Sequence, residues 1–106
     1  MKRLFCALAL VLVLVGSSFA LTNKEYGRLM SNPEFARADR ELNTTWEGLK
    51  DVLSGRDLER VKREQRQWIS NGRDKAARRY MRDGYSRVEA YTEATRDRIE
   101  ALKAYY

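Results

Sequence analysis

The chain has 106 residues, and its 21 lysines and arginines against 15 aspartates and glutamates give it a net charge of +6. It contains no histidine and one cysteine, which excludes most metal-ligand sets and removes the usual general base of an enzyme. This length is enough for one small domain with a modest core.

Residues 1–20 have the form of a secretory signal peptide. Two basic residues precede an unbroken apolar run at 4–15, and Ser18 and Ala20 are small residues at the −3 and −1 positions of a cleavage site. The alternative is a membrane anchor, but a helix over this run spans only about 18 Å of a hydrocarbon core about 30 Å thick. We therefore expect a mature chain of residues 21–106 that is periplasmic or secreted and keeps no stable membrane anchor.

Cleavage changes the charge balance. The cysteine, Cys6, leaves with the signal peptide, and loss of two basic residues leaves 19 against 15 acidic ones, a net charge of +4. In an exported protein this excess favours an acidic partner or an anionic envelope polymer over nucleic acid. The alternative is a solvated surface on which both signs of charge are interspersed.

The composition predicts an all-α protein, because one proline, six glycines and strong helix formers leave little room for strands. Thr22 to Glu25 has the form of a capping box and predicts a short lead-in helix up to about Met30. Asn32-Pro33 predicts the start of a long helix that Ser54-Gly55 is expected to end. Its apolar stripe consists of Phe35, Ala38, Leu42, Trp46, Leu49 and Leu53.

A second long helix is predicted from about Asp57 to Asp83. Asn71-Gly72 is a turn signal in its middle, where we expect a continuous, locally bent helix, with a break as the alternative. Its predicted inner face consists of Leu58, Val61, Gln65, Trp68, Ile69, Gly72, Ala76 and Tyr80.

After Gly84, a second capping box at Ser86 to Glu89 opens a third helix that runs through Leu102. Short connections imply antiparallel neighbours. The predicted fold is therefore a small antiparallel helical hairpin bundle of about three helices, in one domain at 21–106. The terminal Tyr105 and Tyr106 are expected to fray.

Polar and aromatic residues recur in a fixed order along these helices, among them Asp39, Asn43, Trp46, Gln65, Trp68, Arg73, Asp74 and Arg98. With this order, residues 35–102 resemble the family of exported lysozyme-inhibitor LprI-like domains. We call these eight the signature residues. The resemblance implies a protein that binds a lysozyme and occludes its cleft, without metal or cofactor.

The chain departs from that family in two places. Many members have cysteines at the positions of Ala77 and Ala90, which the hairpin about Asp83-Gly84 would bring face to face. The spacing from Trp68 to the next arginine of the pattern is also one residue longer. An extra helical residue rotates the remainder of the helix by roughly 100° unless a bulge absorbs it, and Gly72 is the expected place for one.

Several signature residues have a structural interpretation beside a functional one. Trp46 and Trp68 are expected to pack in the core, with ligand stacking as the alternative. Gln65 is expected to hydrogen-bond across the bundle rather than to touch a ligand.

The adjacent Arg73 and Asp74 diverge by about 100° on a helix and are not expected to pair with each other. Arg73 is expected to reach a carboxylate of the first helix, either Asp39 or Glu47, and a partner-binding role is the alternative.

We interpret the chain as a small exported binding protein and not as an enzyme, since helical carboxylates that alternate with arginines are ordinarily solvated ion pairs. The resemblance implies that the partner is a lysozyme. The alternative is a periplasmic interaction module for another envelope protein or an anionic envelope polymer. A net charge of +4 gives no long-range attraction to a basic lysozyme, so a local acidic patch would have to offset it.

Overall fold

The computed structural model describes residues 21–106, and the predicted signal peptide lies outside the described residues. The described part is helical and contains no strand, which confirms the predicted all-α class. Its elements are α2 (Asn23–Met30), α3 (Pro33–Val52), α4 (Gly55–Gln67), the π-helix η1 (Trp68–Gly72), α5 (Arg73–Arg82) and α6 (Arg87–Lys103). Because α4, η1 and α5 follow one another without a gap, they form one long helix. With the lead-in helix α2 there are four helices in this part of the chain, against a prediction of about three.

Side-chain caps fix three helix starts. Thr22 Oγ1 accepts a hydrogen bond from the Glu25 N–H, and the Glu25 carboxylate accepts one from the Thr22 N–H. Ser86 and Glu89 form the same reciprocal pair at the start of α6. The Asn32 side chain caps α3. The two predicted capping boxes are thus confirmed, and each cap is worth roughly 1 kcal/mol.

The connection between α3 and α4 differs from the prediction at one residue. Leu53 and Ser54 are extended, and Gly55 has a φ of 59°. Glycine adopts this left-handed conformation without the steric cost that a Cβ would bring. Gly55 therefore begins α4, whereas the sequence predicted that it ends the preceding helix.

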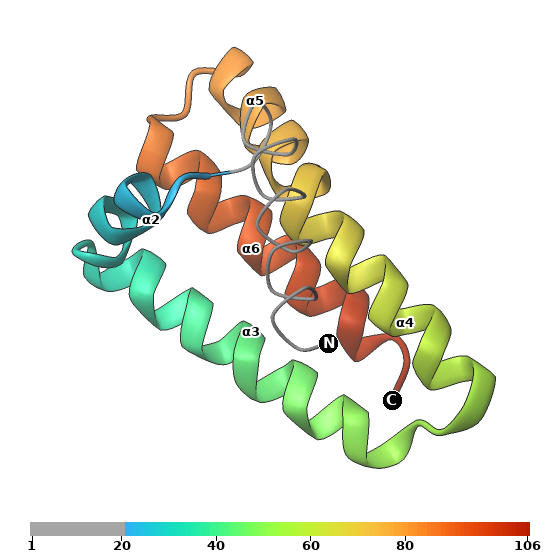
Figure 1. Ribbon diagram of the computed structural model, residues 1–106. Helices are drawn as coiled ribbons and strands as arrows, with labels where there is room; N and C mark the ends of the chain where they lie inside the picture. Colours follow the sequence, from blue (N-terminus) through green and yellow to red (C-terminus); the bar gives the residue numbers. More distant parts are fainter. Residues whose placement is uncertain (1–20) are drawn as a thin grey trace, which may run out of the picture.

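The central helix is α6, which packs against α3 on one side and α5 on the other. Figure 1 shows α3 and the long α4–η1–α5 helix spread apart on either side of α6, with α2 at one end of the bundle. The apolar core is divided accordingly. A first cluster consists of Leu29, Phe35, Ala77, Ala90 and Tyr91. A second cluster consists of Leu42, Leu49, Val61, Ile99 and Leu102.

In the middle of the bundle, fewer apolar side chains are buried than the apolar stripes of the predicted helices suggested. Trp46 and Trp68 pack against the second cluster but are only half-buried. Ile69 is 48% exposed, so its assignment to the inner face is wrong. These side chains lie where α3 and α4 spread apart, so neither helix covers the other's stripe.

The C-terminal residues are attached to the bundle. The Tyr105 hydroxyl donates to Glu64 Oε1 at 2.6 Å, and the Tyr106 hydroxyl donates to the Thr45 carbonyl at 2.7 Å. The expectation that this end frays is therefore wrong, because two hydroxyls hold it to α4 and α3. None of the helices within residues 21–106 combines the length and apolarity needed to cross a bilayer.

Candidate ligand-binding groove

A groove of about 350 Å³ lies between α3 and the α4–η1–α5 helix and reaches α2 at one end. Its lining includes six of the eight signature residues: Asp39, Asn43, Trp46, Gln65, Trp68 and Arg73. The remaining lining residues in the described chain are Leu21, Asn23, Tyr26, Leu42 and Ile69. Asp74 and Arg98 are not part of the lining, so the fold brings most of the set, but not all of it, to one surface.

The π-helix η1 aligns two of the lining residues. The Arg73 N–H donates to the Trp68 carbonyl, five residues earlier. In an α-helix, residues five apart are separated by about 140° around the axis. The wider turn brings the Arg73 guanidinium carbon to 5.3 Å from the centroid of the Trp68 ring. The turn ends at Gly72 and absorbs the extra residue in the Trp-to-Arg spacing, which confirms the predicted bulge. Single π-turns of this kind often occur at functional sites.

Arg73 has an unusual environment for a charged side chain. It is only 9% exposed, and its guanidinium lies over the rings of Trp68 and Tyr26, at 5.3 Å and 5.9 Å from their centroids. Among residues 21–106 no carboxylate forms an ion pair with it, and its side chain donates no hydrogen bond. Burial lowers the pKa of Arg73, an effect that the negative charge of Asp39 opposes, and the group stays charged at neutral pH.

The predicted ion pair of Arg73 with a carboxylate of α3 is therefore wrong for both candidates. The carboxylate of Asp39 accepts a hydrogen bond from the Tyr26 hydroxyl at 2.5 Å. Glu47 pairs with Lys50 one turn further along α3, at 3.1 Å. Burial, followed by the hydrogen bond to Asp39, raises the pKa of Tyr26 to about 12.

Gln65 is hydrogen-bonded to an arginine of the central helix α6. The Arg98 Nε of α6 donates to the Gln65 Oε1 at 2.8 Å, which confirms the predicted hydrogen bond across the bundle. Because the amide oxygen is engaged in this way, the NH₂ group of Gln65, a residue of the groove lining, remains as a donor. Burial lowers the pKa of Arg98, and the charge of Glu64 opposes this shift.

Asp74 faces away from the groove, as expected for the neighbour of Arg73 on a helix. Its carboxylate accepts hydrogen bonds from the Tyr91 hydroxyl of α6 and from Arg78 Nη1, the latter at 2.7 Å. Burial, followed by the bond to Asp74, raises the pKa of Tyr91 to about 12. This contact joins α5 to α6 and has no access to a ligand of the groove.

The outer edge of the groove is partly apolar. Asn43 is exposed on α3, and Trp46 lies one turn further along with Lys50 Nζ 5.7 Å from its ring centroid. Ile69 faces them from η1. The groove thus presents aromatic walls, the three amides of Asn23, Asn43 and Gln65, one carboxylate and one buried cation. This is the donor set of a binding site, and the described residues hold no cluster of acidic side chains suited to a metal ion.

The sequence did not predict that Tyr26 and Ile69 line the groove. Tyr26 precedes the segment that carries the resemblance, and it enters the groove only because α2 folds against α3. Ile69 was assigned to the core because its position fits the apolar period. The π-turn that begins after Gln67 changes which residues face outward, and an α-helical period does not show this.

The described residues form a small all-helical protein with a groove of mixed polar and aromatic lining. Residues 22–102 match the model of the family described as Lysozyme inhibitor LprI, and the chain belongs to this family. No curated protein and no solved structure matches the chain. The description of this family names an inhibitor.

Proposed function

We propose that this chain is an exported protein that inhibits a lysozyme by binding it, with the face around the groove as the contact surface. The family match over residues 22–102 carries the proposal. The geometry supports it, since residues of the family pattern from α3, α4, η1 and α5 lie around one groove. Export rests on the signal-peptide form of residues 1–20.

The edge of the groove has the composition of a protein contact surface. Ile69 is 48% exposed, and the half-buried rings of Trp46 and Trp68 lie beside it. Large apolar and aromatic side chains near the centre of an interface often contribute most of its binding free energy. Ile69 is therefore the residue whose exposure a bound partner would most reduce.

The charge distribution suggests how a basic lysozyme could be accommodated. α3 carries five acidic residues against three basic ones, whereas the α4–η1–α5 helix carries ten basic residues against four acidic ones. A basic partner would meet attraction on the α3 side of the groove and repulsion on the other. This asymmetry provides the local acidic region that a net charge of +4 otherwise lacks.

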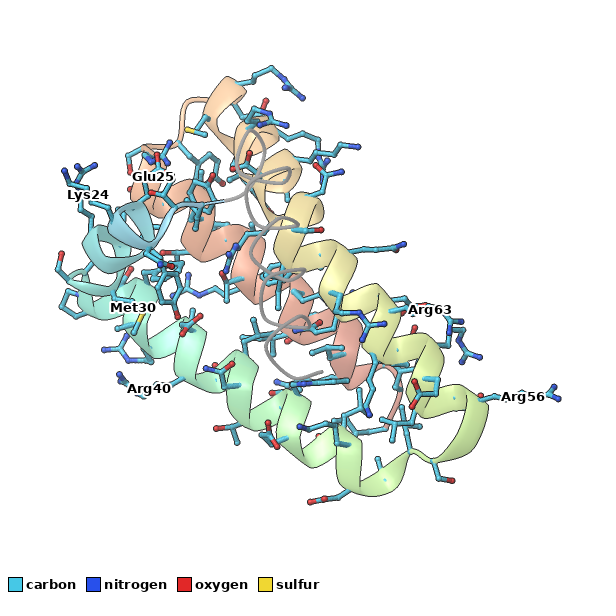
Figure 2. All side chains as sticks on the ribbon, in the orientation of Figure 1. Lys24, Glu25, Met30, Arg40, Arg56 and Arg63 are labelled. Carbon is cyan, nitrogen blue, oxygen red and sulfur yellow. The ribbon has the colours of Figure 1, made fainter. Side chains whose placement is uncertain are left out.

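The same asymmetry favours a second candidate, an anionic envelope polymer. Figure 2 shows Arg56 and Arg63 projecting away from α4 on the outer side of the bundle. Further exposed basic residues on this helix are Arg60, Arg66, Lys75, Arg78, Arg79 and Arg82. A linear polyanion could neutralise such a row of charges, and its binding would be strongly salt-dependent.

The two candidates are separated by one experiment at two salt concentrations. We would measure the binding of the purified protein to lysozyme and to an anionic glycan, together with muramidase activity. The Debye length falls from about 10 Å at 0.1 M to about 3 Å at 1 M salt, which weakens attraction to a polyanion. Lysozyme binding that survives high salt, with loss of muramidase activity, is the expected result. Salt-sensitive glycan binding without lysozyme binding would overturn the inhibitor proposal.

A further inference from the structure

The groove contains a buried positive charge that forms no direct ion pair within residues 21–106, although the charge of Asp39 acts on it from the same groove. A buried ion is costly unless it is paired and hydrogen-bonded. Arg73 is 9% exposed, lines the groove and has neither an ion pair nor a side-chain hydrogen bond among residues 21–106. The guanidinium lies over the rings of Tyr26 and Trp68, and among residues 21–106 it does not donate to the Tyr26 hydroxyl. The free donor capacity of the guanidinium is therefore available to an anionic group that enters the groove.

The side chains around Arg73 restrict which class of ligand can bring this anionic group into the groove. The planar guanidinium matches a carboxylate with two parallel hydrogen bonds. The Gln65 NH₂ group and the Asn43 amide can hydrogen-bond to hydroxyl or carbonyl groups, and Asp39 adds an acceptor. Trp46 and Trp68 provide broad apolar faces beside these polar groups. A volume of about 350 Å³ lies at the lower end of the range for small-molecule sites, about 300–1,000 Å³.

We propose that the groove binds a carboxylate-bearing saccharide, with the carboxylate paired to Arg73 and the sugar ring against the indole faces. A sugar alternates polar edges with apolar C–H faces, and this matches the alternation of amides and aromatic rings in the lining. An aliphatic acid would leave the amides without partners, and a neutral sugar would leave Arg73 without one. The inference does not depend on lysozyme inhibition, because the groove can hold a sugar whether or not lysozyme binds.

Tryptophan fluorescence gives a direct measurement, since the two tryptophans of the protein, Trp46 and Trp68, both line the groove. We would titrate the purified protein with N-acetylmuramic acid and with its neutral counterpart N-acetylglucosamine. The acidic sugar should change the emission saturably, and the neutral one should bind about tenfold more weakly or worse, since a hydrogen-bonded charge pair is lost. Equal binding of both sugars, or no saturable change with either, would overturn the proposal.

Variants then test the role of Arg73 itself. Arg73→Gln should lose the preference for the acidic sugar, and Arg73→Lys should keep only part of it because an ammonium lacks the planar fork. Arg37→Gln removes an exposed arginine of α3 outside the groove and should change nothing. Circular dichroism melts check that each variant folds, and the comparison of the two sugars on the unchanged protein does not depend on them. Unchanged preference in a folded Arg73→Gln variant would contradict the assignment.

Free glutamate is the last ligand in this series. It carries two carboxylates but no sugar ring, so it tests whether an acidic side chain of a protein partner is the true occupant. We expect it to bind much more weakly than N-acetylmuramic acid, because it cannot cover the indole faces. Binding of the same strength would overturn the saccharide and leave a general carboxylate site.

Discussion

Tyrosine hydroxyls paired with carboxylates are the recurrent polar contacts between helices of this protein. Tyr26 bonds to Asp39 between α2 and α3, and Tyr91 bonds to Asp74 between α6 and α5. Two further pairs join Tyr80 to Asp97 and Tyr105 to Glu64, each at 2.6 Å. A hydroxyl that donates to a carboxylate satisfies part of a buried charge without bringing in a second charge. These pairs therefore link the helices in or beside the two apolar clusters, against which the tyrosine rings pack.

This arrangement predicts alkaline sensitivity. The pKa values of Tyr26 and Tyr91 are raised to about 12, above the ordinary value of 10.0 expected in the unfolded chain. Between these values the folded state binds more protons than the unfolded state, so the free energy of unfolding falls as pH rises. The stabilisation is fully present below about pH 10 and is lost toward pH 12. Thermal melts at stepped pH should show a loss on the order of 2 kcal/mol for the pair, after allowance for solvent screening.

The control for this effect is the double variant Tyr26→Phe with Tyr91→Phe, which removes both titrating hydroxyls. It should be less stable at pH 8 and should lose less stability between pH 10 and 12. An equally steep decline in the variant would assign the alkaline transition to other groups.

Trp68, which lines the groove, should contribute less to the free energy of unfolding than a core residue does. Trp68 is half-buried, whereas Leu49 in the second cluster is 0% exposed. We expect Leu49→Ala to cost about 2–5 kcal/mol, the range for truncation in a packed core. Trp68→Ala should cost about 1–2 kcal/mol, below the 3–5 kcal/mol expected for a fully buried ring. Chemical denaturation of both variants measures the difference, and equal costs would place Trp68 in the core.

Among the helical elements, the π-turn η1 accommodates the extra residue between Trp68 and Arg73 and keeps both residues in the groove lining. Ser70 lies in this turn and is exposed. Its deletion would restore a regular α-helix in which Trp68 and the arginine are four residues apart and still on one face. We predict that the Ser70 deletion folds and is more stable. A gain of about 1 kcal/mol would raise the melting temperature by roughly 4–8 °C.

A deletion elsewhere in the same helix serves as the control. Arg63 is exposed like Ser70 but lies in the regular part of α4. Removing it rotates the preceding turns by about 100° relative to the groove and the second cluster. The melting temperature should fall sharply. If both deletions have the same effect, the extra residue is not confined to η1.

The α5–α6 hairpin makes a second prediction at this scale. Ala77 and Ala90 are both 0% exposed and belong to the first core cluster. Replacement of both by cysteine should yield a disulfide under oxidising conditions, and a loop of about 15 residues adds about 3 kcal/mol on the entropic model. Thiol titration and thermal melts with and without reductant measure this. Thiols that stay free after unhindered oxidation would mean that the Cα atoms are more than about 7 Å apart.

The sequence predicted the helices and their caps well, because capping boxes and apolar periods are local signals. It also predicted the bulge near Gly72 from one extra residue in a spacing. It did not predict that Ile69 is exposed, and it did not predict the groove. An apolar stripe shows which face of a helix is apolar, but it does not show how far away the neighbouring helix lies. The sequence also did not predict that Arg73 lacks an ion pair with α3, because the partners of the α3 carboxylates come from the tertiary structure. The candidate carboxylates on α3 were engaged by Tyr26, from α2, and by Lys50.

At the scale of the whole molecule, the bundle has two apolar clusters with a polar groove that extends between them. Leu42 of the second cluster lines the groove, as does Tyr26, which packs against the first. Each cluster can hold its end of the bundle while the helices spread apart in the middle. We therefore expect that exposed residues on the groove edge, such as Ile69, can be replaced at little cost in folding free energy, since exposed substitutions usually change it by less than about 0.5 kcal/mol.

The central claim is that the face around the groove binds and inhibits a lysozyme, and a matched pair of variants tests it most directly. Ile69 and Val52 are exposed aliphatic residues, at 48% and 59%, but only Ile69 lines the groove. We would titrate muramidase activity with the unchanged protein, with Ile69→Glu and with Val52→Glu. We expect inhibition by the unchanged protein and by Val52→Glu, and inhibition weakened about tenfold or more by Ile69→Glu. Equal inhibition by the two variants, or no inhibition by the unchanged protein, would contradict it.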